Sequence, residues 1–265
     1  MAKKRKLKKS AALLIGILGF FVIYFIAFNF GKSLDKQTET NPKKAEETED
    51  TRSLLTQISS KNKIYVSDKS EKSVDGVKIE ERYWDEIKYS FKEFSGVRSP
   101  ESYDELYVGY SDDGIRFSTD LNFFRVYTVN KEEYYKVPVM YKKEFENLIK
   151  KSIYTSFDFI KQYKAWDKVN IIYGDKTKSI PKWKYDKLSY QMAAKRMVGK
   201  VQPEKNKERS KYNFVINVKG KSYEAKMETM GKDYVKITCK GEEAYYEVND
   251  SLFEYIRDEI FKIEE

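Results

Sequence analysis

Two stretches of this sequence resemble each other, and that repetition limits the folds open to the chain more than any other feature. Residues 64–69 resemble residues 171–176, and residues 94–101 resemble residues 197–204. Residues 132–137 recur as residues 242–248, and an apolar pattern with helical spacing follows each of them. Because the matches come in the same order and at similar spacing, we interpret the chain as an internal duplication.

Both copies predict the same order of elements. An apolar strand leads to a helix that we expect to end at Gly96 in the first copy and Gly199 in the second, since glycine is common just after a helix. Four strands with tight turns and a closing helix follow. The sequence therefore predicts an α+β fold of two tandem β-α-β-β-β-β-α repeats, with antiparallel sheets and helices on one face. The turn signals are Asp113 with Gly114, Asn130 with Lys131, Gly220 with Lys221, Gly231 with Lys232, and Lys240 with Gly241.

This order of elements is similar to that of each half of the TATA-box-binding protein fold. The resemblance lies in element order alone and extends to no motif. It implies one continuous, curved antiparallel sheet with helices on one side. Function is not carried over, because unrelated activities share one fold.

The N-terminus predicts a membrane anchor. Residues 1–10 contain six Lys and Arg residues and no acid, and residues 11–30 contain no charge. Twenty helical residues span about 30 Å, the thickness of the hydrocarbon core of a bilayer. Since basic flanks stay in the cytoplasm, we expect a single-pass protein of the cell membrane, with the N-terminus inside and the C-terminal domain outside.

A cleaved signal peptide is the alternative for this segment. Such peptides have apolar cores of about 7–15 residues and a small-residue cleavage site, whereas this run is longer and ends without an Ala-x-Ala pattern. The chain is thus expected to divide as follows: basic cytoplasmic tail 1–10, transmembrane signal anchor 11–30, flexible tether 31–56, first extracytoplasmic repeat 57–153, apolar connector 154–168 and second extracytoplasmic repeat 169–265.

Charge argues against nucleic acid as a partner. The chain has 51 basic and 42 acidic residues. Removing the six basic residues of the tail leaves 45 against 42, so the predicted outer domain is nearly neutral. A nearly neutral domain offers phosphate backbones little attraction. We therefore expect the lipid bilayer, bound through residues 11–30, and another envelope protein as partners.

Two scarcities limit the chemistry. The chain has no histidine, which excludes Ser-His-Asp and Cys-His catalysis and every zinc site that needs histidine. Its one cysteine, Cys239, cannot form an intramolecular disulfide, and strand alternation predicts that it is buried. Neighbouring acids such as Glu80 and Glu81 diverge on an element, so adjacency does not predict catalysis. We expect no cofactor, no metal and no enzyme activity.

Strand alternation also predicts which side chains face away from the helices. On the strand that contains Val235, Ile237 and Cys239, the other side chains should point outward. The same reasoning applied to both copies gives a candidate partner-binding face, with an ordinary solvated face as the alternative. The residues of that candidate face are Arg116, Arg125, Tyr127, Asn217, Lys226 and Lys236.

These features favour a membrane-anchored, extracytoplasmic binding or interaction module of a bacterial cell envelope: a sensor, an assembly factor or an accessory protein. Two alternatives remain. One is an envelope hydrolase whose paired carboxylates meet in a cleft, and the other is a domain that binds lipid or glycan in a cavity.

Overall fold

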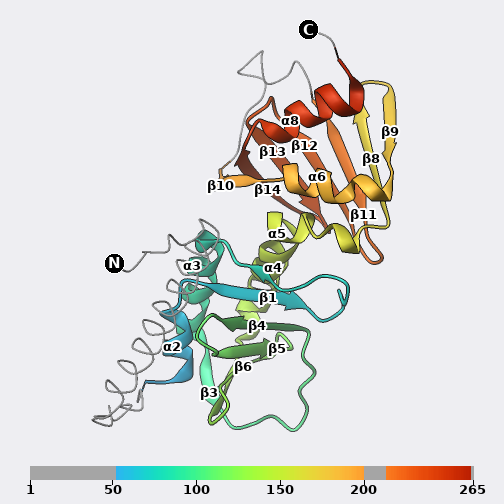
Figure 1. The fold of residues 1–265 in the computed structure, drawn as a ribbon. Helices are drawn as coiled ribbons and strands as arrows, with labels where there is room; N and C mark the ends of the chain where they lie inside the picture. The colour runs from blue at the N-terminus through green and yellow to red at the C-terminus, as the bar shows by residue number, and fades with distance from the viewer. Residues whose placement is uncertain (1–51, 200–212, 264–265) are drawn as a thin grey trace, which may run out of the picture. The chain divides into compact units, whose positions relative to one another are not determined.

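Two antiparallel sheets of seven strands each, with helices packed against them, make up the α+β fold (Figure 1). The computed structural model describes residues 52–199 and 213–263, and Arg52–Glu265 form one compact unit. The predicted tail and anchor, and the tether as far as residue 51, lie outside the described residues. Within the described residues, no helix has the length and apolar character needed to cross a membrane.

The first sheet has the strand order β2-β1-β4-β5-β6-β7-β3. Most of its strands alternate buried and exposed side chains, which is typical of a sheet with one face on a core. Its strands are β1 (Ile64–Asp68), β2 (Val77–Lys78), β3 (Ser95–Val97), β4 (Tyr107–Ser111), β5 (Arg116–Thr119), β6 (Phe123–Tyr127) and β7 (Glu132–Lys136).

The second sheet has the order β10-β14-β13-β12-β11-β8-β9. Starting from β9, this is the first sheet's order again, each strand having its counterpart seven places earlier. The predicted continuous sheet is therefore wrong, because the strands pair into two separate sheets. Its strands are β8 (Lys168–Tyr173), β9 (Lys176–Ile180), β10 (Ala194–Val198), β11 (Val215–Lys219), β12 (Glu224–Thr229), β13 (Tyr234–Cys239) and β14 (Glu242–Val248).

Helices cover one face of each sheet, and Figure 1 shows α6 and α8 against the second sheet. In α3 the apolar residues Trp84 and Ile87 recur at helical spacing and are buried, as the sequence predicts. The helices are α2 (Leu54–Ser59), α3 (Glu81–Ser90), α4 (Val139–Tyr154), α5 (Phe157–Ile160), α6 (Tyr185–Gln191) and α8 (Ser251–Glu254). Shorter or irregular turns are η1 (Phe91–Glu93), η2 (Tyr163–Ala165), η3 (Lys182–Lys184) and the π-helical η5 (Tyr255–Phe261).

Each sheet has two more strands than the five predicted, because the segments on either side of the first helix also pair. Gly96 lies in β3 opposite Tyr135 and does not cap α3, which ends at Ser90. Gly199 follows β10, whereas α6 ends at Gln191. The predicted tether is also too long, since α2 begins at Leu54 with the Ser53 hydroxyl accepting a hydrogen bond at its N-terminus.

The apolar connector is a packed segment, as its composition predicts. The Phe157 ring packs edge-on against Tyr246 of β14, with 4.8 Å between ring centroids. The Phe159 ring lies 5.2 Å from Tyr154 of α4 and 4.7 Å from Tyr223, which precedes β12. The connector therefore joins α4 to the second sheet through aromatic contacts.

A cluster of polar side chains around the buried Glu71 also joins the two halves, and we call it the junction cluster. Its members are Asp68, Glu71, Tyr154, Ser222 and Lys240. Glu71 is 2% exposed and accepts hydrogen bonds from the Ser222 hydroxyl and the Lys240 ammonium group. Lys240 also donates to the Tyr154 hydroxyl over 2.9 Å, and that hydroxyl donates to Asp68 over 2.5 Å. Two hairpin turns of the second half, those that hold Ser222 and Lys240, thus enclose an acid of the first half.

Candidate functional site

The outward and inward faces of the strands agree with the predicted alternation. Val235, Ile237 and Cys239 are buried, and Lys236 between them is partly exposed. Burial raises the pKa of the Cys239 thiol to about 12, so the thiol is protonated at neutral pH. Cys239 is therefore part of the core.

The six predicted face residues lie on two different sheets. Arg116 and Tyr127 are directly opposite each other on β5 and β6 of the first sheet, and Arg125 is on the next outward row. Asn217 and Lys226 are directly opposite each other on β11 and β12 of the second sheet, with Lys236 on the next row. The structure thus gives two separate groups of three residues.

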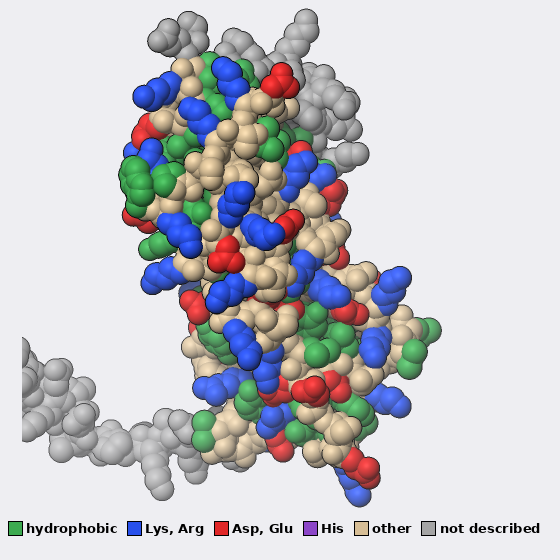
Figure 2. All heavy atoms as spheres, turned by 90° about the vertical axis from the view of Figure 1, so that its right-hand side faces the viewer, with side chains coloured by type: hydrophobic (Ala, Val, Ile, Leu, Met, Phe, Trp, Pro, Cys, Tyr) green, Lys and Arg blue, Asp and Glu red, His purple; other side chains and the backbone are tan. Residues whose placement is uncertain are grey.

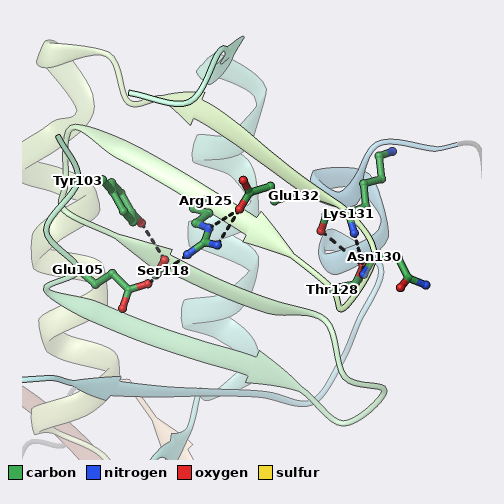
Figure 3. Close-up of polar contacts among 8 residues, drawn as sticks. All are labelled: Tyr103, Glu105, Ser118, Arg125, Thr128, Asn130, Lys131 and Glu132. Atoms are coloured by element: carbon green, nitrogen blue, oxygen red, sulfur yellow. Dashed lines mark hydrogen bonds and ion pairs between the residues drawn. The ribbon is translucent and has the colours of Figure 1, made fainter. Parts of the chain in front are cut away.

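Residues 98–106 cover part of the outward face of the first sheet (Figure 3). They connect β3 at one edge to β4, which lies beyond β5, β6 and β7, so the connection must cross those strands. The Tyr103 hydroxyl bonds to the Ser118 hydroxyl of β5 at 2.9 Å, and its ring packs edge-on against Tyr134 of β7. Ser118 is fully buried as a result, so this half of the face is closed.

Arg125 lies under the same crossing segment and is held by two carboxylates (Figure 3). Its Nη2 atom is 2.6 Å from Oε2 of Glu132, and its Nη1 atom is 3.6 Å from Oε1 of Glu105. Burial tends to raise the pKa of Glu105, but hydrogen bonds from Lys69 and Ser118 outweigh it and keep the pKa below its usual value. Arg125 therefore links the crossing segment to the sheet, and its guanidinium group already pairs with two carboxylates of the same domain.

The other half of this face presents a row of directly opposite residues, which we call the tyrosine row: Tyr65, Tyr110, Arg116 and Tyr127. The rings of Tyr65 and Tyr110 stack with their centroids 5.0 Å apart and 15° between their planes. Tyr110 is 45% exposed, and Arg116 is exposed and makes no ion pair with a described residue. The tyrosine row is the accessible part of the first sheet's outward face, and it includes Arg116 and Tyr127 of the predicted face.

Sequence reasoning named Arg116 and Tyr127 but missed Tyr65 and Tyr110. Alternation within β1 and β4 contained the signal, because Tyr65 lies between the buried Ile64 and Val66, and Tyr110 follows the buried Gly109. The sequence does not show that β1 pairs with β4, or in which register. That pairing places Tyr65 opposite Tyr110 and so brings the two rings together.

The outward face of the second sheet is polar. Lys226 and Lys236 pair with Glu228 and Glu243 at 2.7 and 2.6 Å, so both cations are neutralised locally. A shallow depression of about 450 Å³ lies beside Asn217. On the view of the surface in Figure 2, Lys and Arg side chains likewise lie among acidic and hydrophobic ones. The second sheet offers no aromatic counterpart to the tyrosine row at Asn217 and Lys226.

A polar cleft of about 840 Å³ lies between α5, the end of α6, the start of β10 and the β2–α3 corner. It brings together acids that are distant in the sequence, Glu80 and Asp158, and Asp158 pairs with Lys161 at 2.6 Å. Burial raises the pKa of Glu80; Lys78 opposes this shift and Asp158 adds to it. Glu80 is the residue before α3, yet its carboxylate does not cap that helix and makes no hydrogen bond with a described residue.

Metal chemistry has no support in the described part of the chain, where no three His, Cys, Asp or Glu side chains gather in a way that can hold an ion. Comparison of the sequence and fold with protein-family models, with curated proteins and with solved structures found no match.

Proposed function

We propose that this protein is a membrane-anchored, non-catalytic interaction module outside a bacterial cell, which binds an envelope protein through the tyrosine row. The anchor is residues 11–30, the basic tail 1–10 stays in the cytoplasm, and the C-terminal domain lies outside. The sequence supports this topology through the uncharged run and its basic flank.

The single observation that carries the proposal is the tyrosine row, in which Tyr110 is exposed and Arg116 makes no ion pair with a described residue. Tyrosine supplies a large, rigid contact area at low entropic cost, and tyrosine and arginine are enriched among residues that dominate binding energy. Arg116 stands between Tyr110 and Tyr127 and has no described acid to pair with. An acidic side chain of the partner would supply the missing carboxylate, in a bidentate pair.

In-cell cross-linking of the full-length protein, followed by mass spectrometry of what co-purifies from membranes, tests this proposal. One envelope protein should be recovered from the wild type and lost from the Tyr110→Ala and Arg116→Ala variants. Lys226→Ala is the matched control, because it removes an exposed cation from the other sheet. Equal recovery from all variants would refute the tyrosine row as the binding surface.

We also propose that the two halves are tandem repeats of one duplicated β-α-β-β-β-β-α unit, each extended by two edge strands. The common strand order supports this. The tyrosine row occurs in the first half only, so the two copies would have diverged at the surface and kept the core.

A second candidate function is an envelope hydrolase at the cleft. The observation in its favour is that Glu80 and Asp158, from different elements, line one cleft, and that the raised pKa of Glu80 is typical of a general acid. Its test is the release of reducing ends from purified cell-wall polymer. Release that stops in Glu80→Gln would favour the enzyme over the interaction module, and no release would exclude it.

A further inference from the structure

The cleft has a lining that suits a ligand of low net charge with many hydroxyl groups. Three acids, Glu80, Glu81 and Asp158, are balanced there by Lys63, Lys78 and Lys161. A lining with balanced charges does not attract a polyanion, but it offers both donors and acceptors of hydrogen bonds. The remaining polar groups include Asn62 and Ser189.

One polar group of the cleft lining lacks a hydrogen-bond partner among the described residues. The half-buried carboxylate of Glu80 accepts no hydrogen bond from any of them. Unsatisfied buried polar groups are costly, so a ligand that donates to Glu80 would recover part of that cost.

Apolar surface is present on the same walls. Ile79, Phe157, Met192 and Ala193 contribute to the lining, and Tyr190 stands at the cleft with 83% of its surface exposed. An exposed tyrosine ring beside a polar cleft can pack against the C–H face of a sugar ring while its hydroxyl stays in water. Tyr190 is therefore the main apolar surface that the cleft offers, because Ile79, Phe157 and Met192 are buried.

We propose that this cleft binds an uncharged oligosaccharide with acetamido groups, with Tyr190 against one sugar ring and the Glu80 carboxylate accepting a hydrogen bond from an amide N–H. Such a ligand differs from the partner of the tyrosine row, and the two surfaces meet only near Lys78, which is opposite Tyr65 and also lines the cleft.

An extended peptide added to a free sheet edge is the competing occupant. The cleft is bordered by β2 and by the start of β10, and both are edge strands. However, β2 has two residues and the β10 pairing is interrupted by a register shift. Short and irregular edges are poor templates for strand addition, so the oligosaccharide is favoured.

Isothermal titration calorimetry of the full-length protein, in a detergent without a sugar headgroup, tests the proposal. The probes are tetramers of β-1,4-linked N-acetylglucosamine and of β-1,4-linked glucose. The acetylated tetramer should bind more tightly than the glucose tetramer. Tyr190→Ala should weaken its binding about tenfold, and Glu80→Ala should weaken it as well.

Tyr89→Ala is the matched control, because Tyr89 is also exposed, at 68%, and does not line the cleft. Circular dichroism melts confirm that each variant is folded. No binding of the acetylated tetramer, or unchanged binding in Tyr190→Ala, would overturn the proposal. So would binding of an extended peptide in place of either sugar. Tyr110→Ala should leave sugar binding unchanged, which separates this site from the tyrosine row.

Discussion

Removing the cation of the junction cluster should destabilise the folded domain strongly. In Lys240→Met the buried Glu71 carboxylate keeps the Ser222 hydroxyl as a donor but loses the one cation that pairs with it among the described residues. Breaking a buried ion pair by removing one partner costs about 3–5 kcal/mol. Because the Lys240 side chain is 31% exposed, water can compensate in part, and we expect the free energy of unfolding to fall by about 2–4 kcal/mol.

Thermal unfolding of the full-length protein, followed by circular dichroism, measures this loss. For a domain of this size, 1 kcal/mol corresponds to about 2–4 °C in melting temperature, so Lys240→Met should melt roughly 4–16 °C lower. Lys226→Met is the matched control, because its partner Glu228 is exposed to water. That change should alter the unfolding free energy by about 0.5 kcal/mol or less.

The double variant Glu71→Gln with Lys240→Met tests whether the unpaired Glu71 charge causes the loss of stability in Lys240→Met. Its neutral amide can still accept from Ser222, so at least half of the lost stability should return. A coupling energy above about 1 kcal/mol between the two positions is expected. If the double variant is as unstable as the sum of the singles, or if Lys240→Met costs under about 1 kcal/mol, the reasoning is refuted.

Three other experiments test the packing and the buried groups described above. Gly109→Ala would place a Cβ atom in steric conflict with the Phe117 ring and the Tyr65 carbonyl oxygen, so unfolding measurements should show a loss of about 1–3 kcal/mol. Gly96→Ala, which has open space around the new Cβ atom, should show little. The buried Cys239 thiol, with its pKa raised to about 12, should react with iodoacetamide at pH 8 only as fast as the protein unfolds. Burial raises the pKa of Glu80, so its ionised form opposes folding at neutral pH; Glu80→Gln should melt higher at pH 7, with a gain that vanishes on acidification below the usual pKa of glutamate.

Local signals in the sequence predicted the local structure well. Asp113 with Gly114 connects β4 to β5, and Lys240 with Gly241 connects β13 to β14, because these residue pairs tolerate the backbone that a tight turn requires. The burial of Cys239 was also predicted correctly, because side chains along a strand alternate between its two faces with a period of two.

Contacts between distant residues explain what the sequence could not predict. The edge strands β2 and β3 have two and three residues, too few for a periodic pattern. Arg125 was predicted to lie on an open partner-binding face, but Glu105 reaches it because residues 98–106 cross the sheet, and only the strand order reveals that crossing. The cleft depends on how α5 lies beside α3 and α6, which no local propensity fixes.

The position of Glu71 also affects the order in which the domain can fold during synthesis. The cation that neutralises this acid lies 169 residues further along, in the turn between β13 and β14. A growing chain leaves the ribosome N-terminus first, so the first sheet is made while Glu71 still faces water. The β13–β14 hairpin, which is made later, then removes that acid from solvent. A fragment that stops after α4 would keep the acid uncovered, so the two halves are less separable than their similar strand orders suggest.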